Sequence, residues 1–434
     1  MNIKVFLGLA GVVMVSTLSI YGLYRFHAYQ DHRDLQIELD TAEKEGLPVT
    51  WTAYAASIKS AIPATNAAPI YQQIAHARLK KGTDLTADES DLFLHPDPQH
   101  TALALGEIQR NHKMLDLADA AARLPRCWFN RNWSKGLSVL MPEFSDMKMA
   151  AKLVAFRGSI AAAKGKSTEA IRNIDEVFQI AKHSGEEGTV ISTLVNQAIV
   201  AIGLHHLALW AFSHRGNPEY ASALSAGLKQ WPTKNLQYQN RDVLLAIRDI
   251  MALSTTRQGL VDLGIKEEDI PPFERLAPLL LSRPKANIAI AHQIRLVWEA
   301  LALPPAERIQ KIDAAYLELN KAMAAYPTGS DIYRKMMLGG ESDKGLSDHG
   351  FVLSDQVSKA HRLGYEALAR ALGNPKVPAT IDIDDLASPF DGKPVTYHFD
   401  GRQMSIEVSC PDSEIKIPIL KLPSDHDFDP KAKN

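Results

Sequence analysis

Residues 144–212, FSDMKMAAKLVAFRGSIAAAKGKSTEAIRNIDEVFQIAKHSGEEGTVISTLVNQAIVAIGLHHLALWAF, decide the fold of this chain. Apolar residues recur there at helical spacing in three stretches: roughly Phe144–Lys164, a second that opens at Ser167 and ends before Gly185, and a third from about Val190. The first is apolar around most of its girth, which is typical of a buried helix. The sequence therefore predicts three consecutive helices around which the rest of the chain is organised.

The first two of these helices resemble one copy of a helical repeat. Gly158, Gly165 and Ala170 stand where a tetratricopeptide repeat has its helix-A glycine, turn glycine and helix-B alanine, and Ile174 stands where it has an aromatic residue. Four positions depart from the repeat, which has tryptophan, leucine, tyrosine and proline there: Val154, Arg157, Ala161 and Lys182. No second copy follows at the period of about 34 residues. The alternatives are a tetratricopeptide-like hairpin and a generic helical hairpin.

Length and composition indicate a globular protein. The chain has 434 residues, enough for two or three domains, and 46% of them are hydrophobic. Its 48 Lys and Arg nearly balance its 50 Asp and Glu, so overall charge gives no argument for a nucleic-acid partner. Cys127 and Cys410 are too few for a disulfide framework and too far apart for a metal motif. A single disulfide between them requires an oxidising compartment.

An uninterrupted apolar run, Val5–Leu23, is long enough to cross a membrane as a helix. It is compatible with a cleaved signal peptide, or with an anchor that leaves the following domain on either side of the membrane. No small-x-small cleavage site follows it, which argues against cleavage. Lys4 on one side and Arg25 and Arg33 on the other nearly tie under the positive-inside rule. The short N-terminal tail and large following domain favour a signal anchor with an extracytoplasmic, periplasmic domain.

Three stretches resemble a family of uncharacterised bacterial proteins with one N-terminal anchor and a helical outer domain: Gly46–Thr50, Pro63–Tyr71 and Cys127–Pro142. Ser388–Val395 resembles the C-terminal box of the same family and, distantly, the C-terminal loop of major pseudopilins, whose acidic residues bind calcium. This chain lacks the acidic-glycine ending of those pilins, so the nearby aspartates are a weak calcium candidate: Asp382, Asp384 and Asp385. The family resemblance implies an architecture and no chemistry.

Residues Pro125–Gly136, which we call the aromatic segment, combine aromatic and cationic side chains in a composition that interfaces favour. One interpretation is that the segment binds a partner through four residues: Arg126, Trp128, Arg131 and Trp133. The other is that its rings close the end of the helical core. Cys127 is expected to be a small buried residue, because no base lies near it in the sequence.

The search for catalytic and metal motifs is negative. Gly165-Lys166-Ser167 resembles the end of a phosphate loop, but Ile160 stands where that motif has glycine, so the stretch is expected to be a turn between helices. The histidines at 205, 206 and 214 have no acidic partner at metal-ligand spacing and are expected to be packing residues. We therefore predict no catalytic residue, no metal and no cofactor. Paired carboxylates leave no regular signature, which keeps an enzyme open.

The remaining chain is predicted to be helical up to Leu372 and strand-forming after Pro378. Asn217-Pro218 is expected to open a helix, and 286–303 with 305–325 to form an antiparallel pair joined at a Pro-Pro step. Val395–Phe399, Asp400-Gly401 and Met404–Val408 have the pattern of a β-hairpin. The predicted domains are an anchor (1–28), a stalk and N-terminal helical region (29–124), a main helical domain (125–378) and a small β-rich region (379–434).

These observations predict a mainly α protein: an N-terminal transmembrane helix, an antiparallel helical-hairpin array of tetratricopeptide-like or solenoid-like kind, and a small C-terminal β-hairpin. The predicted function is that of a protein-interaction module at the bacterial cell envelope, held in the membrane by residues 5–23, with a protein or peptide partner and no nucleic acid. The alternative is an envelope hydrolase whose site no motif reveals.

Overall fold

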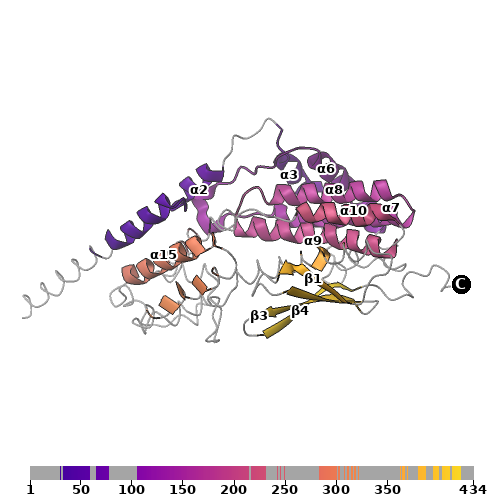
Figure 1. The fold of residues 1–434 in the computed structure, drawn as a ribbon. Coiled ribbons are helices and arrows are strands. Elements are labelled where there is room, and N and C mark those ends of the chain that lie inside the picture. Colours follow the sequence, from indigo (N-terminus) through magenta and orange to yellow (C-terminus); the bar gives the residue numbers. More distant parts are fainter. Residues whose placement is uncertain are drawn as a thin grey trace, which may run out of the picture. The chain divides into compact units, whose positions relative to one another are not determined.

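The structure is a computed structural model that describes residues 33–58, 65–77, 105–214, 217–230 and 283–300, four strands between 380 and 421, and isolated positions between these stretches. Most of the described residues are helical (Figure 1). The chain divides into two compact units. The first unit comprises 1–54, 241–303 and 307–348, and the second comprises 55–240, 304–306 and 349–434. The predicted four-domain division stays a prediction.

Three long helices occupy the centre of the second unit. α7 spans Glu143–Ala163, α8 spans Ser167–Ser184 and α9 spans Val190–Ser213 (Figure 1). These bounds lie close to those predicted, so the three consecutive helices are confirmed. Each of the three packs against the other two. This mutual packing explains why α7 and α9 are apolar on more than one face.

Local sequence fixes the turns between these helices. Gly165 has a φ of 71°, and the amide of Lys166 donates to the Ala161 carbonyl at 2.9 Å, which closes the C-terminus of α7 as the glycine pattern predicts. Gly158 allows close packing, since a Cβ there would lie 2.8 Å from the Trp210 ring and 3.2 Å from the Ala170 carbonyl oxygen. The glycine and alanine that suggested a helical repeat therefore mark a close approach of α7 to α8.

The shorter helices of this unit are α3 (Ala68–Ala77), α6 (His112–Ala122), the 3₁₀ helix η2 (Trp133–Ser138), α10 (Pro218–Gly227) and the 3₁₀ turn η3 (Leu228–Gln230). Asn217 accepts a hydrogen bond from the Glu219 amide at 2.9 Å and so caps α10, which confirms the helix start predicted at Asn217-Pro218. The helices share one apolar core. Its largest fully buried side chains include Tyr71, Phe129, Met147, Phe156 and Tyr220.

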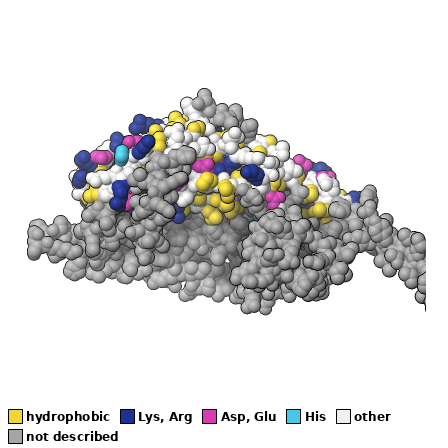
Figure 2. All heavy atoms as spheres, turned by 180° about the vertical axis from the view of Figure 1, so that it is seen from behind, with side chains coloured by type: hydrophobic (Ala, Val, Ile, Leu, Met, Phe, Trp, Pro, Cys, Tyr) yellow, Lys and Arg dark blue, Asp and Glu magenta, His cyan; other side chains and the backbone are white. Residues whose placement is uncertain are grey.

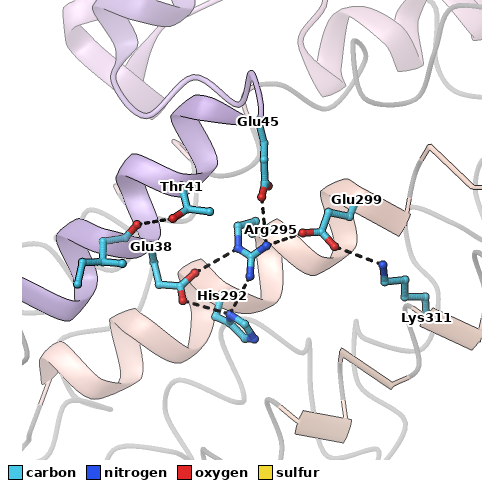
Figure 3. A network of polar contacts seen from close by, with 8 residues as sticks. Glu38, Thr41, Glu45, His292, Arg295, Glu299 and Lys311 are labelled. Carbon is cyan, nitrogen blue, oxygen red and sulfur yellow. Dashed lines mark hydrogen bonds and ion pairs between the residues drawn. The ribbon is translucent and has the colours of Figure 1, made fainter.

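The first unit includes a helical stretch at 33–44 and the helix α15, Arg283–Ala300. Arg295 of α15 lies among several carboxylates in Figure 3. Its Nε is 3.2 Å from Glu38, and its Nη1 contacts Glu45 at 3.2 Å and Glu299. These ion pairs tie the stretch 33–44, which was predicted to be a polar stalk, to a helix about 250 residues further along the chain.

Four strands form an antiparallel sheet in the order β1-β2-β3-β4: β1 (Thr380–Ala387), β2 (Pro394–Phe399), β3 (Gln403–Cys410) and β4 (Ser413–Lys421). Phe399 of β2 pairs with Met404 of β3. The side chains of the strands, including the aspartates of β1, lie outside the described residues. The role of the C-terminal β-rich region therefore stays a prediction.

One described helix, α9, is long and apolar enough to cross a membrane by length and composition, and half of its most apolar window is buried inside the protein. Packing against α7, α8 and α10 gives this apolar composition a structural reason. The predicted anchor, Val5–Leu23, lies outside the described residues, as does most of the predicted helix 305–325.

Candidate interaction site

The backbone of the aromatic segment is fixed by two polar side chains from elsewhere in the chain. Asn66 accepts a hydrogen bond from the Trp128 amide at 2.7 Å and donates to the Trp128 carbonyl at 2.8 Å. Glu186, in the turn between α8 and α9, accepts from the Cys127 amide at 2.9 Å and from Arg126 Nε at 3.1 Å. The segment is therefore held to the helices along its backbone as well as through its side chains.

Of the four residues predicted to bind a partner, only Arg126 has a largely exposed side chain, at 45%. Trp128 is 8% exposed and Trp133 is 6% exposed, and the Arg131 side chain is 5% exposed. Both tryptophan rings thus pack inward, as in the interpretation that they close the end of the helical core. Partner binding by these four residues stays a prediction.

Arg131 is the charged centre of the segment. Its Nε donates to Glu187 Oε1 at 2.7 Å, and its Nη1 donates to Glu143 Oε2 at 3.1 Å and to the Leu140 carbonyl at 3.0 Å. The guanidinium carbon lies 4.7 Å from the centre of the Phe129 ring, close enough for a cation–π contact. We call Arg131, Glu143 and Glu187 the buried clamp, because together they tie the segment to the start of α7 and to the α8–α9 turn.

Burial controls the electrostatics of this region. It raises the pKa of the Glu187 carboxyl to about 7, against the opposing effect of the Arg131 charge. Burial also raises the pKa of the Cys127 thiol, with further contributions from Glu186 and Glu187. Cys127 is a free, fully buried thiol, so the expectation of a small core residue is confirmed and a nucleophilic role is disfavoured.

A buried histidine network lies next to the segment. The Tyr71 hydroxyl donates to His183 Nδ1 at 2.9 Å, and His183 Nε2 donates to the Leu124 carbonyl at 2.9 Å. Burial favours the neutral imidazole and lowers the pKa of His183 to about 4, against the opposing effect of the hydrogen bond to the Leu124 carbonyl. The network connects α3, α8 and the end of α6 immediately before the aromatic segment begins.

A second arginine cluster joins α6, α7 and α8. Arg157 contacts both oxygens of Asp119 at 2.8 and 2.9 Å, Glu176 at 2.7 Å and the Asn173 amide oxygen at 2.5 Å. Burial raises the pKa of the Glu176 carboxyl to about 7, and Asp119 adds to this shift through its charge and a hydrogen bond. Arg157 is a position where the sequence departs from the tetratricopeptide repeat, and the ion pairs give that departure a physical reason.

The predicted packing histidines of α9 are part of the core or its edge. His206 is fully buried, with its Nδ1 2.8 Å from Ser159 Oγ, and His214 Nδ1 lies 3.1 Å from the Trp210 carbonyl at the end of the helix. His205 is partly exposed. Among the described residues, no group of three or more His, Cys, Asp or Glu side chains is placed to hold a metal ion.

The exposed face at the start of α9 is the other candidate surface. Ile191 is 54% exposed and Leu194 is 49% exposed, and one helical turn separates them. Hydrophobic side chains reach the surface of the described part in Figure 2. No Asp, Glu, Lys or Arg occurs anywhere in Val190–Ser213. This combination of exposed branched side chains and absent charge is favourable for contact with an apolar partner.

The sequence interpretation identified the aromatic segment but missed its acidic partners. The sequence interpretation gave no role to Glu143, Glu186 or Glu187. One signal was available: two adjacent glutamates stand directly before a long stretch without charge. A buried carboxylate requires an oppositely charged partner. Arg126 and Arg131 of the aromatic segment were two arginines that could have been considered for this role.

Comparisons with protein-family models, with curated proteins and with solved structures give no match to this chain. The candidate site therefore has to be judged on its own geometry.

Proposed function

We propose that this protein is a membrane-anchored helical interaction module of the bacterial cell envelope, held by Val5–Leu23 and exposing its helical units outside the cytoplasm. The helical array, of tetratricopeptide-like or solenoid-like kind, is proposed to bind an apolar peptide segment of a partner protein. The observation that carries this proposal is the exposed, charge-free face of α9 at Ile191 and Leu194.

The nature of the partner follows from this face. A helix without charged residues offers no ion pair, so binding has to come from apolar contact, worth about 25 cal/mol for each Å² buried. A charged partner segment would lose hydration without compensation, which disfavours nucleic acid and acidic or basic peptides. An amphipathic helix with apolar residues three and four positions apart matches the spacing of Ile191 and Leu194.

Site-specific photo-cross-linking in the full-length, membrane-inserted chain tests this proposal. A photoreactive amino acid at 191 or 194 is expected to give a discrete adduct, whereas the same group at Asp175, an exposed position of α8, gives none. Leu194→Asp is expected to abolish the adduct formed from position 191. Equal adducts from all three positions, or adduct formation that survives Leu194→Asp, would contradict the proposal. An adduct of twice the chain mass would identify self-association instead.

The envelope hydrolase remains the second candidate, and one observation favours it. Asp119 and Glu176 are both only about a fifth exposed, contact the same guanidinium of Arg157 and interact with each other, and the pKa of Glu176 is raised to about 7. Hydrolysis of chromogenic glycoside, ester or peptide substrates by the full-length protein, lost in Glu176→Gln, would support this function. Equal hydrolysis by the variant would assign the cluster to structure alone.

A further inference from the structure

We infer that the partner segment of this protein is an apolar helix with acidic residues at its flanks, which docks at one end of the central helices. This inference rests on the proposed function, which it extends by a further apolar side chain and by the charge of the partner. Three apolar side chains and three exposed lysines make up the surface. We call these six residues the docking end: Leu140, Ile191, Leu194, Lys135, Lys148 and Lys182.

The connections between the central helices bring these residues to one end. α7 and α8 pack together across a short turn, and so do α8 and α9 (Figure 1). Helices joined in this way are antiparallel, so α7 and α9 begin at the end at which α8 finishes. Arg131 supports this arrangement, since it reaches Glu143 in the first turn of α7 and Glu187 in the turn before α9.

Three large apolar side chains are exposed at the docking end. Leu140 is 82% exposed, Ile191 is 54% exposed and Leu194 is 49% exposed. A single exposed leucine needs no explanation, whereas a group at one end of a helical unit is typical of an interaction surface. The Leu140 carbonyl accepts from Arg131 Nη1 at 3.0 Å, so the Leu140 side chain extends from a fixed backbone.

The lysines of the docking end are free to meet a partner. Lys135 in η2, Lys148 in the second turn of α7 and Lys182 in the last turn of α8 are exposed, and none has a carboxylate partner among the described residues. The acidic side chains at this end lie deeper: Glu143, Asp146, Glu186 and Glu187. A partner surface therefore meets lysines before it meets carboxylates.

The apolar and cationic parts of the docking end select different parts of one partner. The charge-free face of α9 excludes charges from the partner residues that cover it. Carboxylates beyond those residues keep contact with water and can approach the lysines, which guides association and specificity more than it adds affinity. Neighbouring helices pack about 8–10 Å apart. A partner helix of three to four turns, about 16–22 Å long, therefore spans both parts.

Fluorescence anisotropy of designed peptides, with the full-length chain in phosphatidylcholine nanodiscs, tests the charge of the partner. The probes are three helical peptides that share leucines at i, i+3, i+4 and i+7 and carry glutamate, glutamine or lysine at both flanks. At low salt, the glutamate-flanked peptide is expected to bind about tenfold more tightly than the glutamine-flanked one, and the lysine-flanked one most weakly. This preference should fall below about twofold at about 1 M salt, where exposed charges are screened.

Substitutions at the docking end separate its two parts. Lys148→Glu with Lys182→Glu is expected to remove the preference for glutamate flanks and to leave binding of the glutamine-flanked peptide within about twofold. The matched control is Lys164→Glu with Lys166→Glu, which alters two exposed lysines at the opposite end of α7 and should keep the preference. Leu140→Asp is expected to weaken binding of all three peptides about tenfold.

The outcomes distinguish this inference from the proposed function. Equal affinities for the three peptides, with binding lost in Leu194→Asp, would overturn the acidic flanks and leave the proposed function standing. A preference that survives charge reversal at Lys148 and Lys182 would also overturn them. Binding that Leu194→Asp does not change, or no binding of any peptide, would contradict the proposed function as well. A lipid adduct from a photoreactive group at 191 would assign the docking end to the bilayer and overturn the peptide partner.

Discussion

Arg131 and Arg295 both gather carboxylates from distant parts of the chain, but they do so at different depths. The Arg131 side chain is 5% exposed and faces Glu187 at 1%, whereas Arg295 is 17% exposed and its three carboxylates are 22 to 32% exposed. Water and salt can compensate charge at the shallower cluster more fully than at the deeper one. The same residue types thus form a deeply buried ion-pair cluster in one unit and a partly exposed one in the other.

Replacing the central arginine should show the difference in stability between the Arg131 and Arg295 clusters most clearly. Arg131→Met removes the cation that Glu143 and Glu187 both contact, and we expect a loss of about 3–5 kcal/mol in the free energy of unfolding of the second unit. Hydrogen exchange at residues 150–160 of α7 in the full-length protein measures this loss. An effect below about 1 kcal/mol would show that the clamp is open or hydrated in solution.

Titration of the buried His183 is expected to give the next largest change in the stability of the second unit. The pKa of His183, about 4 when folded, lies below its ordinary value of 6.5, so only the unfolded chain gains a proton between these values. Stability of the second unit is therefore lost as pH falls from 6.5 to 4, by up to about 3 kcal/mol. His183→Gln should remove this loss.

Hydrogen-exchange rates of the unaltered chain and of His183→Gln, compared at each pH, isolate the contribution of His183 to stability. Every other titrating group is present in both proteins. This includes Glu187, whose effect on stability has the opposite dependence on pH. If the unaltered chain and His183→Gln lost stability equally as the pH falls from 6.5 to 4, His183 would not be the cause of the loss.

The smallest loss of stability is expected when Arg295, the more exposed of the two arginines, is replaced. Arg295→Met should cost no more than about 1 kcal/mol in the first unit, because its carboxylates can rehydrate. Protection of α15 in the unaltered chain should also fall toward that of the variant when salt is raised to about 1 M, at which charges are screened within about 3 Å. A cost equal to that of Arg131→Met, insensitive to salt, would remove the distinction between the two clusters.

Local signals in the sequence were sufficient for the helices at the centre of the second unit. The turn at Gly165 requires a left-handed residue, and the N-cap of α9 is Thr189, whose Oγ1 accepts from the Ser192 amide. The N-cap of α10, Asn217, is followed by proline. Each of these signals acts within a few residues. This is why the bounds of α7, α8 and α9 lie close to their predicted positions.

The candidate site was less predictable because its partners come from distant parts of the chain. Composition indicated that the aromatic segment was unusual, but the Trp128 backbone and the Arg131 side chain are held by Asn66 and Glu187, each more than fifty residues away. A periodic pattern carries no information about such pairs. The same reason applies to Arg157, whose departure from a repeat pattern was visible although its pairing with Asp119 and Glu176 was not.

The length and apolarity of α9 also matter while the chain is being made. In a chain that is exported behind an N-terminal anchor, this helix would pass the translocon as a stretch long enough to partition sideways into lipid. Polar residues along α9 oppose its partitioning into lipid, because each raises the free energy of insertion. These residues are Asn196, Gln197, His205 and His206. Asn196 and His206 are buried in the folded core, where Asn196 donates to the Ala181 carbonyl and His206 meets Ser159. In an exported chain, the side chains that join α9 to its neighbours after folding would thus also favour its release into water beforehand.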